Sequence, residues 1–262
     1  MFFTNQDVID LVRWRRQLHA HPELSCLEVE TSRAVRAFLN KTQPDRVISD
    51  IGGHGLAAIF EGAAPGPTLM FRAELDGLPI EEISDAPHRS RVTGQGHLRG
   101  HDGHMASLAG LALGLGRQRP KRGRAVLLFQ PAEENGAGAA AVIADPKFAD
   151  IAPDFAFAYH NMPGLPLGKA PLRAGPVNWA SRGMRIGLNG KTAHASMAEF
   201  GVSPMRALAQ LMPALTALGP GGALDTTPSS PSPTQNWASA RSGSRRAEGR
   251  SGRPCARSRI NK

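Results

Sequence analysis

The spacing of apolar side chains predicts alternating helices and strands over the first 172 residues. Apolar residues recur every three to four positions in two early segments, as in amphipathic helices, at residues 5–19 and 29–39. Short apolar runs predict strands at residues 56–60, 68–73, 125–130 and 155–159. Two more helices are predicted at residues 105–115 and 136–143. Strands alternating with helices favour an α/β fold with a sheet covered on both faces.

The pattern changes from residue 173 onward. Residues 184–188 alternate as a half-exposed strand should, and a helix is predicted at about 204–218. This stretch, 173–225, predicts the start of a smaller α+β domain. Residues 226–262 contain no Leu, Val, Phe or Met and are rich in Ser, Arg, Pro, Gly and Ala, so they cannot form a core. The predicted domains are therefore 1–172, 173–225 and a disordered basic tail, 226–262.

The positive charge is concentrated in this tail. The chain has a formal net charge of +9, of which residues 226–262 carry +7 and the first 225 residues only +2. Arginines in the tail make phosphate binding physically plausible. However, the tail has a single aromatic residue, Trp237, and no nucleic-acid-binding motif, which disfavours a nucleic-acid partner.

Composition also disfavours a membrane or secreted protein. No run of about 18 apolar residues is present, so no membrane-spanning helix is predicted. The first seven residues lack the basic and apolar regions of a signal peptide. The two cysteines, Cys26 and Cys255, are far apart and lack the spacing of a metal site, so a cytoplasmic location is expected.

Residues 100–104, with the sequence Gly-His-Asp-Gly-His, are the first candidate for a functional site. Imidazole and carboxylate groups are common ligands of zinc, manganese and nickel. Glycine allows a sharp turn and the close approach of a ligand. A polar loop that simply precedes the helix at 105–115 is the alternative interpretation.

Three predicted strands end in side chains that can bind a metal. Asp76 follows the strand at 68–73, the pair Glu133 and Glu134 follows the strand at 125–130, and His160 follows the strand at 155–159. Open α/β sheets place their sites at such strand ends. Adjacent carboxylates repel each other unless a cation neutralises them, which fits a metal ligand beside a general base. A solvated turn at Asp76 and a structural role for His160 remain the alternatives.

Six motifs, in this order along the chain, resemble those of the aminoacylase/carboxypeptidase-type metallopeptidases. They are Trp14–Leu24, Arg72–Pro79, Gly100–His104, Phe129–Glu134, His160–Pro163 and Gly190–Ala195. The resemblance is to the branch of hippurate hydrolase, N-acyl-amino-acid amidohydrolases and indole-acetyl-amino-acid hydrolases, and it covers roughly residues 8–220. It implies a catalytic domain with a mixed, mainly parallel sheet and a smaller lid domain that forms a homodimer.

The resemblance also implies an activity and a set of residue roles. The expected reaction is metal-dependent hydrolysis of N-acetyl- or N-benzoyl-type amino acids, with two divalent ions (Zn, Mn, Ni or Co) per subunit. His101, Glu134 and His160 are the expected metal ligands, and Glu133 the general base that deprotonates the attacking water. Asp76 is expected to support the ligands. His194, in the lid, is expected to reach a substrate carbonyl across the dimer; an exposed strand-end residue is its alternative.

Two departures from the family pattern predict an impaired enzyme. Arg99 occupies the position of a bridging cysteine ligand, and a guanidinium has no lone pair for a metal. A metal ligand expected late in the family's sequences has no counterpart, and the tail composition suggests a shifted reading frame. The alternative to an impaired amidohydrolase is an inactive family member that retains a partial fold or dimerisation.

Overall fold

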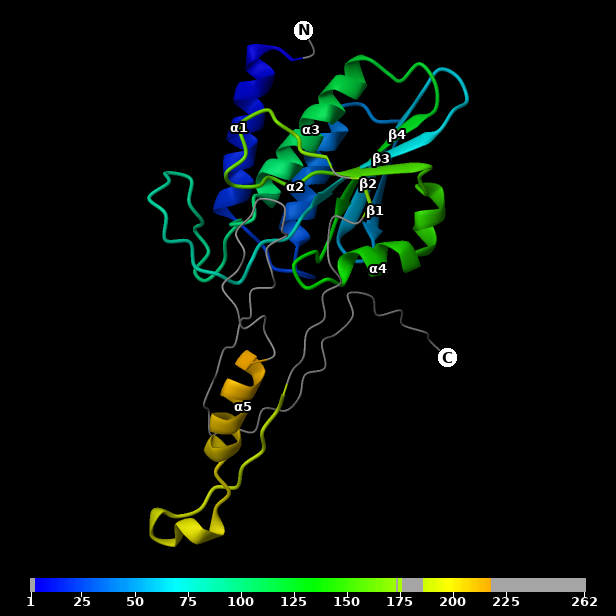
Figure 1. Cartoon of the computed structure of the whole chain (residues 1–262). Helices are drawn as coiled ribbons and strands as arrows, with labels where there is room; N and C mark the ends of the chain where they lie inside the picture. The colour runs from blue at the N-terminus through cyan, green and yellow to red at the C-terminus, as the bar shows by residue number, and fades with distance from the viewer. Residues whose placement is uncertain (1–2, 173, 176–185, 218–262) are drawn as a thin grey trace. The chain divides into compact units, whose positions relative to one another are not determined.

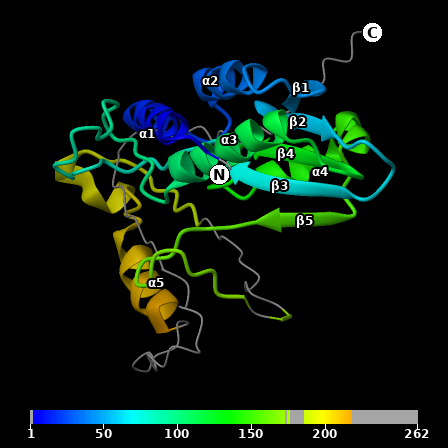
Figure 2. The same cartoon turned by 90° about the horizontal axis from the view of Figure 1, so that it is seen from above.

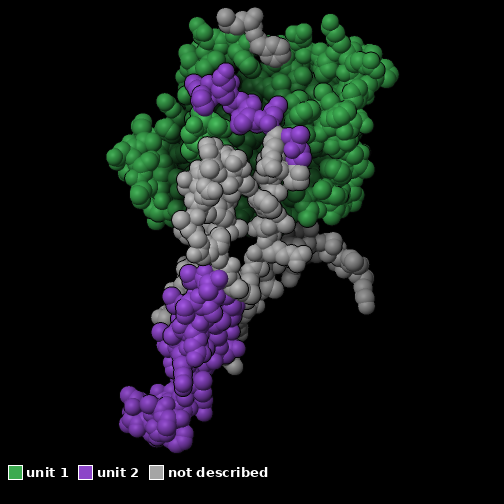
Figure 3. All heavy atoms as spheres, in the orientation of Figure 1, with its two compact units in different colours: residues 1–165, 250–262 green, residues 166–249 purple. Residues whose placement is uncertain are grey.

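The computed structural model describes residues 3–172, 174–175 and 186–217, which fall into two compact units (Figure 3). The first unit extends to Leu165, and the second begins at Pro166. This division lies seven residues before the predicted boundary at 172/173. Each unit is described by itself below.

The first unit is built on a five-stranded mixed sheet with the order β1-β2-β4-β3-β5 (Figures 1 and 2). The strands are β1 (Arg46–Ile51), β2 (Gly55–Glu61), β3 (Thr68–Glu74), β4 (Arg124–Gln130) and β5 (Phe155–Ala158). Strand β2 runs antiparallel to β1 and β4, whereas β3 is parallel to both β4 and β5. Four strands thus share one direction, which confirms the predicted mixed, mainly parallel α/β sheet.

Helices cover both faces of this sheet (Figure 1). One face packs against α1 (Asn5–Ala20), α2 (Val29–Asn40) and α3 (His101–Arg117). The other packs against α4 (Gly138–Ala144) and the short 3-10 helix η1 (Pro146–Asp150).

The side chains of β4 show why two covering layers are needed. Ala125, Leu127 and Phe129 point into the core beneath α1–α3, whereas Val126 and Leu128 point into the core beneath α4 and η1. Alternate residues of a strand face opposite sides of the sheet, so an apolar run is stable only when both sides are buried.

Most of the predicted elements of the first unit are present, with two differences. Strand β1 was not predicted, because Arg46–Ile51 mixes polar and apolar residues and pairs only at one edge of the sheet. The prediction of residues 100–104 as a loop before a helix was wrong. Helix α3 already begins at His101, so His101, Asp102 and His104 lie in its first turn.

The described part of the second unit contains a short 3-10 helix, η2 (Ala195–Phe200), and a helix, α5 (Met205–Ala217). The helix confirms the one predicted at about 204–218. Residues 186–188, described here, are not in a strand, so that part of the predicted strand at 184–188 is wrong. Its first two residues, 184–185, and the predicted tail at 226–262 lie outside the described residues. Within the described part, no helix is long and apolar enough to cross a membrane.

Two glycines of α3 allow a test of how tightly the helical layer packs. A Cβ atom on Gly116 would lie 2.2 Å from the carbonyl oxygen of Thr42, whereas one on Gly103 would meet only Arg15 Nε, at 3.7 Å. We expect Gly116→Ala to lower the free energy of unfolding by about 1–2 kcal/mol, because forced overlap costs more than the helix gains. Gly103→Ala, the matched control, should raise it by up to about 1 kcal/mol. Urea denaturation measures both, and equal effects would contradict this packing.

Candidate metal centre

The predicted site residues of the first unit meet at the carboxyl ends of the parallel strands. Strand β3 leads into Asp76, β4 into Glu133 and Glu134, and β5 into His160. The first turn of α3 adds His101 to the same place. Its N-cap, Gly100, has a left-handed backbone (φ 84°), and a Cβ there would lie 2.6 Å from Asn161 Oδ1. Only glycine fits both constraints.

Asp76 holds both His101 and Glu134. Its backbone carbonyl accepts a hydrogen bond from His101 Nδ1 (2.8 Å), and its Oδ2 accepts from the backbone N–H of Glu134 (2.9 Å) and from Ser25 Oγ (2.7 Å). Burial alone would raise the pKa of Asp76, but the hydrogen bonds from His101, Ser25 and Glu134 outweigh it and lower that pKa. The carboxyl is therefore an ionised anchor.

The Nε2 atom of His101 is suited to bind a metal. Because a carbonyl oxygen can only accept, Nδ1 carries a proton, and when the ring is neutral Nε2 has a free lone pair. That atom is buried without a hydrogen-bond partner, as is Glu134 Oε1, 3.7 Å away. Glu133 Oε2 lies 3.8 Å from the same nitrogen. Unpaired buried polar atoms are costly, and a cation between them would remove that cost.

The charges around Glu133 and Glu134 also favour a bound cation. Burial raises the pKa of Glu134, and the charges of Glu133 and Asp76 add to this effect, while His101 and Arg99 oppose it. Three carboxylates crowd one imidazole, and a divalent ion would stabilise their charged forms. The donor set of His101, Glu133 and Glu134 therefore fits a divalent metal, with all three ligand atoms within 4.8 Å of one another.

A second group of possible ligands, His101, His104 and His160, is less suitable. Both ring nitrogens of His104 already have partners. Nδ1 lies 2.8 Å from Glu74 Oε2, and Nε2 accepts from the backbone N–H of Asn161 (3.2 Å). His104 thus holds β3, α3 and the end of β5 together and has no free lone pair.

His160, a predicted ligand, is exposed and lies beside this centre. Its ring centroid is 6.0 Å from that of His101, and its Nδ1 donates to the carbonyl of Asn161 (2.8 Å). The structure therefore brings His160 and Glu134 each close to His101. It does not gather the three predicted ligands into one group.

Arg99 lies at the mouth of the same centre. Its Nε is 3.5 Å from Glu134 Oε2, and its side chain is 56% exposed. The guanidinium thus neutralises one face of the carboxylate that is expected to bind the metal. The predicted lid residue, His194, belongs to the second unit, where its Nδ1 lies 2.8 Å from Ser196 Oγ.

The sequence did not reveal that Glu28 holds the turn before Glu133 through a hydrogen bond with Ala132. Ala132 has a left-handed backbone (φ 50°), which costs roughly 1–2 kcal/mol for a non-glycine residue. Its N–H donates to Glu28 Oε1 (2.7 Å), and Glu28 is fully buried. Burial raises the pKa of Glu28, although the hydrogen bonds from Ala132 and neighbouring backbone groups oppose this. An acidic residue before α2 was the only signal in the sequence.

A buried network behind His101 was also missed. Asp102 accepts from Arg15 Nε (2.8 Å) and lies 3.0 Å from His19 Nδ1, while His19 Nε2 lies 3.1 Å from Glu82 Oε2. The hydrogen bond with Asp102 outweighs burial and, with Glu82, raises the pKa of His19 above 6.5. Burial would raise the pKa of Asp102, but His19, His97 and Arg15 lower it to about 2. The network fixes the start of α3.

The sequence matches a known protein family. The model of "Peptidase family M20/M25/M40" matches residues 70–244, more than half of the chain. The chain belongs to peptidase family M20/M25/M40. The match to this family includes residues 226–244, which fall within the predicted tail.

Curated relatives in the M20/M25/M40 family include N-acyl amino acid hydrolases. The chain is 35% identical to an N-acetylcysteine deacetylase of Bacillus subtilis over 209 residues, covering 79% of this chain and 54% of the relative. It is 33% identical to "IAA-amino acid hydrolase ILR1-like 5" of Arabidopsis thaliana, covering 81% and 48%. The chain thus spans about half the length of these relatives.

A solved structure supports the same assignment. The Bacillus subtilis YxeP protein, described as a dinuclear metal-binding peptidase of the M20 family, is 37% identical, with a TM-score of 0.58 over 63% of this chain and 45% of that one. The family, the α/β fold and a divalent-metal centre are therefore consistent across sequence and structure.

The raised pKa of His19 predicts a pH-dependent stability. A raised folded-state pKa contributes stability that is fully present below pH 6.5 and is lost as the pH rises through the folded-state value. We therefore expect wild-type protein to exceed His19→Gln in free energy of unfolding most strongly near pH 5.5, with the difference shrinking at higher pH. Denaturation at several pH values measures this. A pH-independent deficit of His19→Gln would contradict the interpretation.

Proposed function

We propose that this chain is a metal-dependent amidohydrolase that cleaves N-acyl amino acids into a carboxylic acid and a free amino acid. One observation carries the proposal: His101 Nε2 and Glu134 Oε1 are buried, unpartnered and 3.7 Å apart at the strand ends. The relatives that hydrolyse N-acetylcysteine and IAA-amino acids support the substrate class.

The residues of the centre have distinct roles in this proposal. His101 and Glu134 would hold a divalent ion. His160, exposed beside them at the end of β5, lies outside their group of donors, so its side chain would have to move to act as the third ligand. A bound divalent ion would polarise the scissile carbonyl and lower the pKa of the attacking water. Glu133, next to a ligand but 35% exposed at its side chain, accepts the proton of that water and passes it to the leaving amine.

Asp76 and His194 act around this chemistry. Asp76 fixes the ring of His101 and the backbone of Glu134, so that both ligands face the same point. His194 is proposed to donate a hydrogen bond to the substrate carbonyl across a homodimer. Zinc, manganese, nickel and cobalt all accept this N/O donor set.

Arg99 favours a second candidate, an impaired or inactive family member. Its guanidinium lies 3.5 Å from the Glu134 carboxylate and competes with a metal for that ligand. A positive charge beside a divalent ion also repels it. One ion rather than two is the occupancy we propose for this chain.

Metal content tests the two candidates. Unit charges about 4 Å apart interact by about 4 kcal/mol near a protein surface, so Arg99→Cys should strengthen zinc binding at least about tenfold. We expect at most one ion per wild-type chain and more in the variant, measured by elemental analysis and equilibrium dialysis. Arg36→Cys, at an exposed position of α2, controls for the effect of an added thiol. Two ions in wild-type protein would refute the inhibitory role of Arg99, and no ion in either would refute the metal centre.

The two neighbouring glutamates should separate binding from chemistry. In the Arg99→Cys background, Glu134→Gln should lose most metal, whereas Glu133→Gln should keep it and lose about 10²–10⁴-fold in hydrolysis. Hydrolysis of N-acetyl- and N-benzoyl-amino acids is measured by amine release. Glu30→Gln, an exposed carboxylate paired with Arg33, is the matched control. Loss of metal in Glu133→Gln would assign that residue to the ligand set instead.

A further inference from the structure

The outward face of α1 carries apolar side chains where a surface helix ordinarily carries polar ones. Val8, Ile9 and Val12 are 51%, 51% and 42% exposed. The inward side of α1 packs on α3 and ends in the buried Leu18. Helix α1 is therefore apolar on two sides, and the core explains only one of them.

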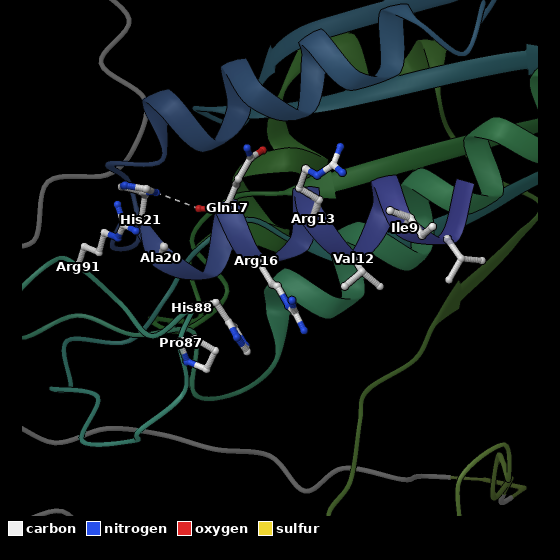
Figure 4. A pocket seen from close by; sticks show the side chains of 11 residues that line it. Ile9, Val12, Arg13, Arg16, Gln17, Ala20, His21, Pro87, His88 and Arg91 are labelled. Atoms are coloured by element: carbon white, nitrogen blue, oxygen red, sulfur yellow. Dashed lines mark hydrogen bonds between the residues drawn. The ribbon is translucent and has the colours of Figure 1, made fainter. Parts of the chain in front are cut away.

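These three side chains line an open pocket of about 720 Å³. Figure 4 shows Ile9 and Val12 at one end of it. Its other wall comes from a loop segment that includes Pro87, His88 and Arg91. The loop is attached to α1 by a hydrogen bond from the backbone N–H of Arg91 to the carbonyl of Ala20 (2.8 Å). The volume is in the range of pockets that bind small molecules, about 300–1,000 Å³.

The lining of the pocket is also basic. Arg13, Arg16 and Arg91 contribute to it together with two histidines, and none of the lining residues is acidic. Arg13 pairs with Asp10. Within the part of the chain that the structure describes, the side chains of Arg16 and Arg91 have no ion pair or hydrogen bond. The pocket thus contains two guanidinium groups without a counterion.

His88 adds a second sign of a missing partner. Its Nδ1 is buried without a hydrogen bond, and Figure 4 shows its ring and the Arg16 side chain projecting into the same space. Burial, with the charges of His19 and Arg16, lowers the pKa of His88. A carboxylate placed there would neutralise Arg16 and accept a hydrogen bond from the imidazole.

We propose that this pocket binds a small amphipathic anion, a carboxylate carrying an aliphatic chain. The carboxylate would lie between Arg16 and Arg91, which present forked donors that match its two oxygens. The aliphatic chain would cover Val8, Ile9 and Val12. The site lies on the outward face of α1, apart from the strand ends that carry the metal centre, and does not depend on the proposed hydrolysis.

Calorimetric titration of the full chain with octanoate tests the proposal. We expect saturable one-to-one binding that weakens as salt is raised, with octanol and acetate binding at least about tenfold more weakly because each lacks one half of the ligand. Arg16→Gln/Arg91→Gln should weaken octanoate binding at least about tenfold, while Arg36→Gln, an exposed arginine outside the pocket, should not change it.

A second variant tests the apolar end of the pocket. Val12→Asn should weaken octanoate but not change the residual binding of acetate, and because Val12 is exposed the fold should tolerate it; circular dichroism checks this. Equal binding of octanol and octanoate, or equal losses in the arginine pair and in Arg36→Gln, would overturn the proposal. An absence of saturable octanoate binding would also overturn it. The same holds if the protein sediments with phosphatidylglycerol vesicles but does not bind free octanoate.

Discussion

The buried carboxyl group of Asp76 is the constraint on which the candidate centre depends. One residue at the end of β3 contacts the first turn of α3 through its backbone and the turn after β4 through its side chain. The three elements are separated by long stretches of chain, and the sheet register alone would not fix their side chains. Loss of the Asp76 anchor would leave His101 and Glu134 free to adopt other rotamers.

The two clusters of histidines and carboxylates differ in how their polar atoms are used. His104 and Glu74 satisfy each other and Asn161, so that cluster stabilises the fold. His101 and Glu134 leave buried atoms unpaired, which destabilises the protein unless a ligand is present. His101 and His104, three positions apart on the same helix, therefore have opposite tasks, and the spacing of histidines alone does not distinguish them.

The elements that carry the centre could be predicted because their signals are local. Strand β4 is apolar at residues 125–129 since both of its faces are buried, and the acidic pair Glu133 and Glu134 follows the strand after two residues. Glu28 and Ala132 are separated by 104 positions in the sequence, and His19 and Asp102 by 83. No local pattern in the sequence therefore reveals these two contacts. The family resemblance supplied the roles of Glu133 and His194, which physical patterns alone left open.

The parallel pairing of β3 with β4 also has a consequence for how the protein folds. The two strands that supply Asp76 and Glu134 meet only after the whole of α3 has crossed between them. The chain must close this long loop before Glu134 can meet Asp76 and His101, and such non-local contacts form slowly. A divalent ion can therefore recognise only the assembled sheet, so added metal should retard unfolding while leaving the early collapse of the chain unchanged.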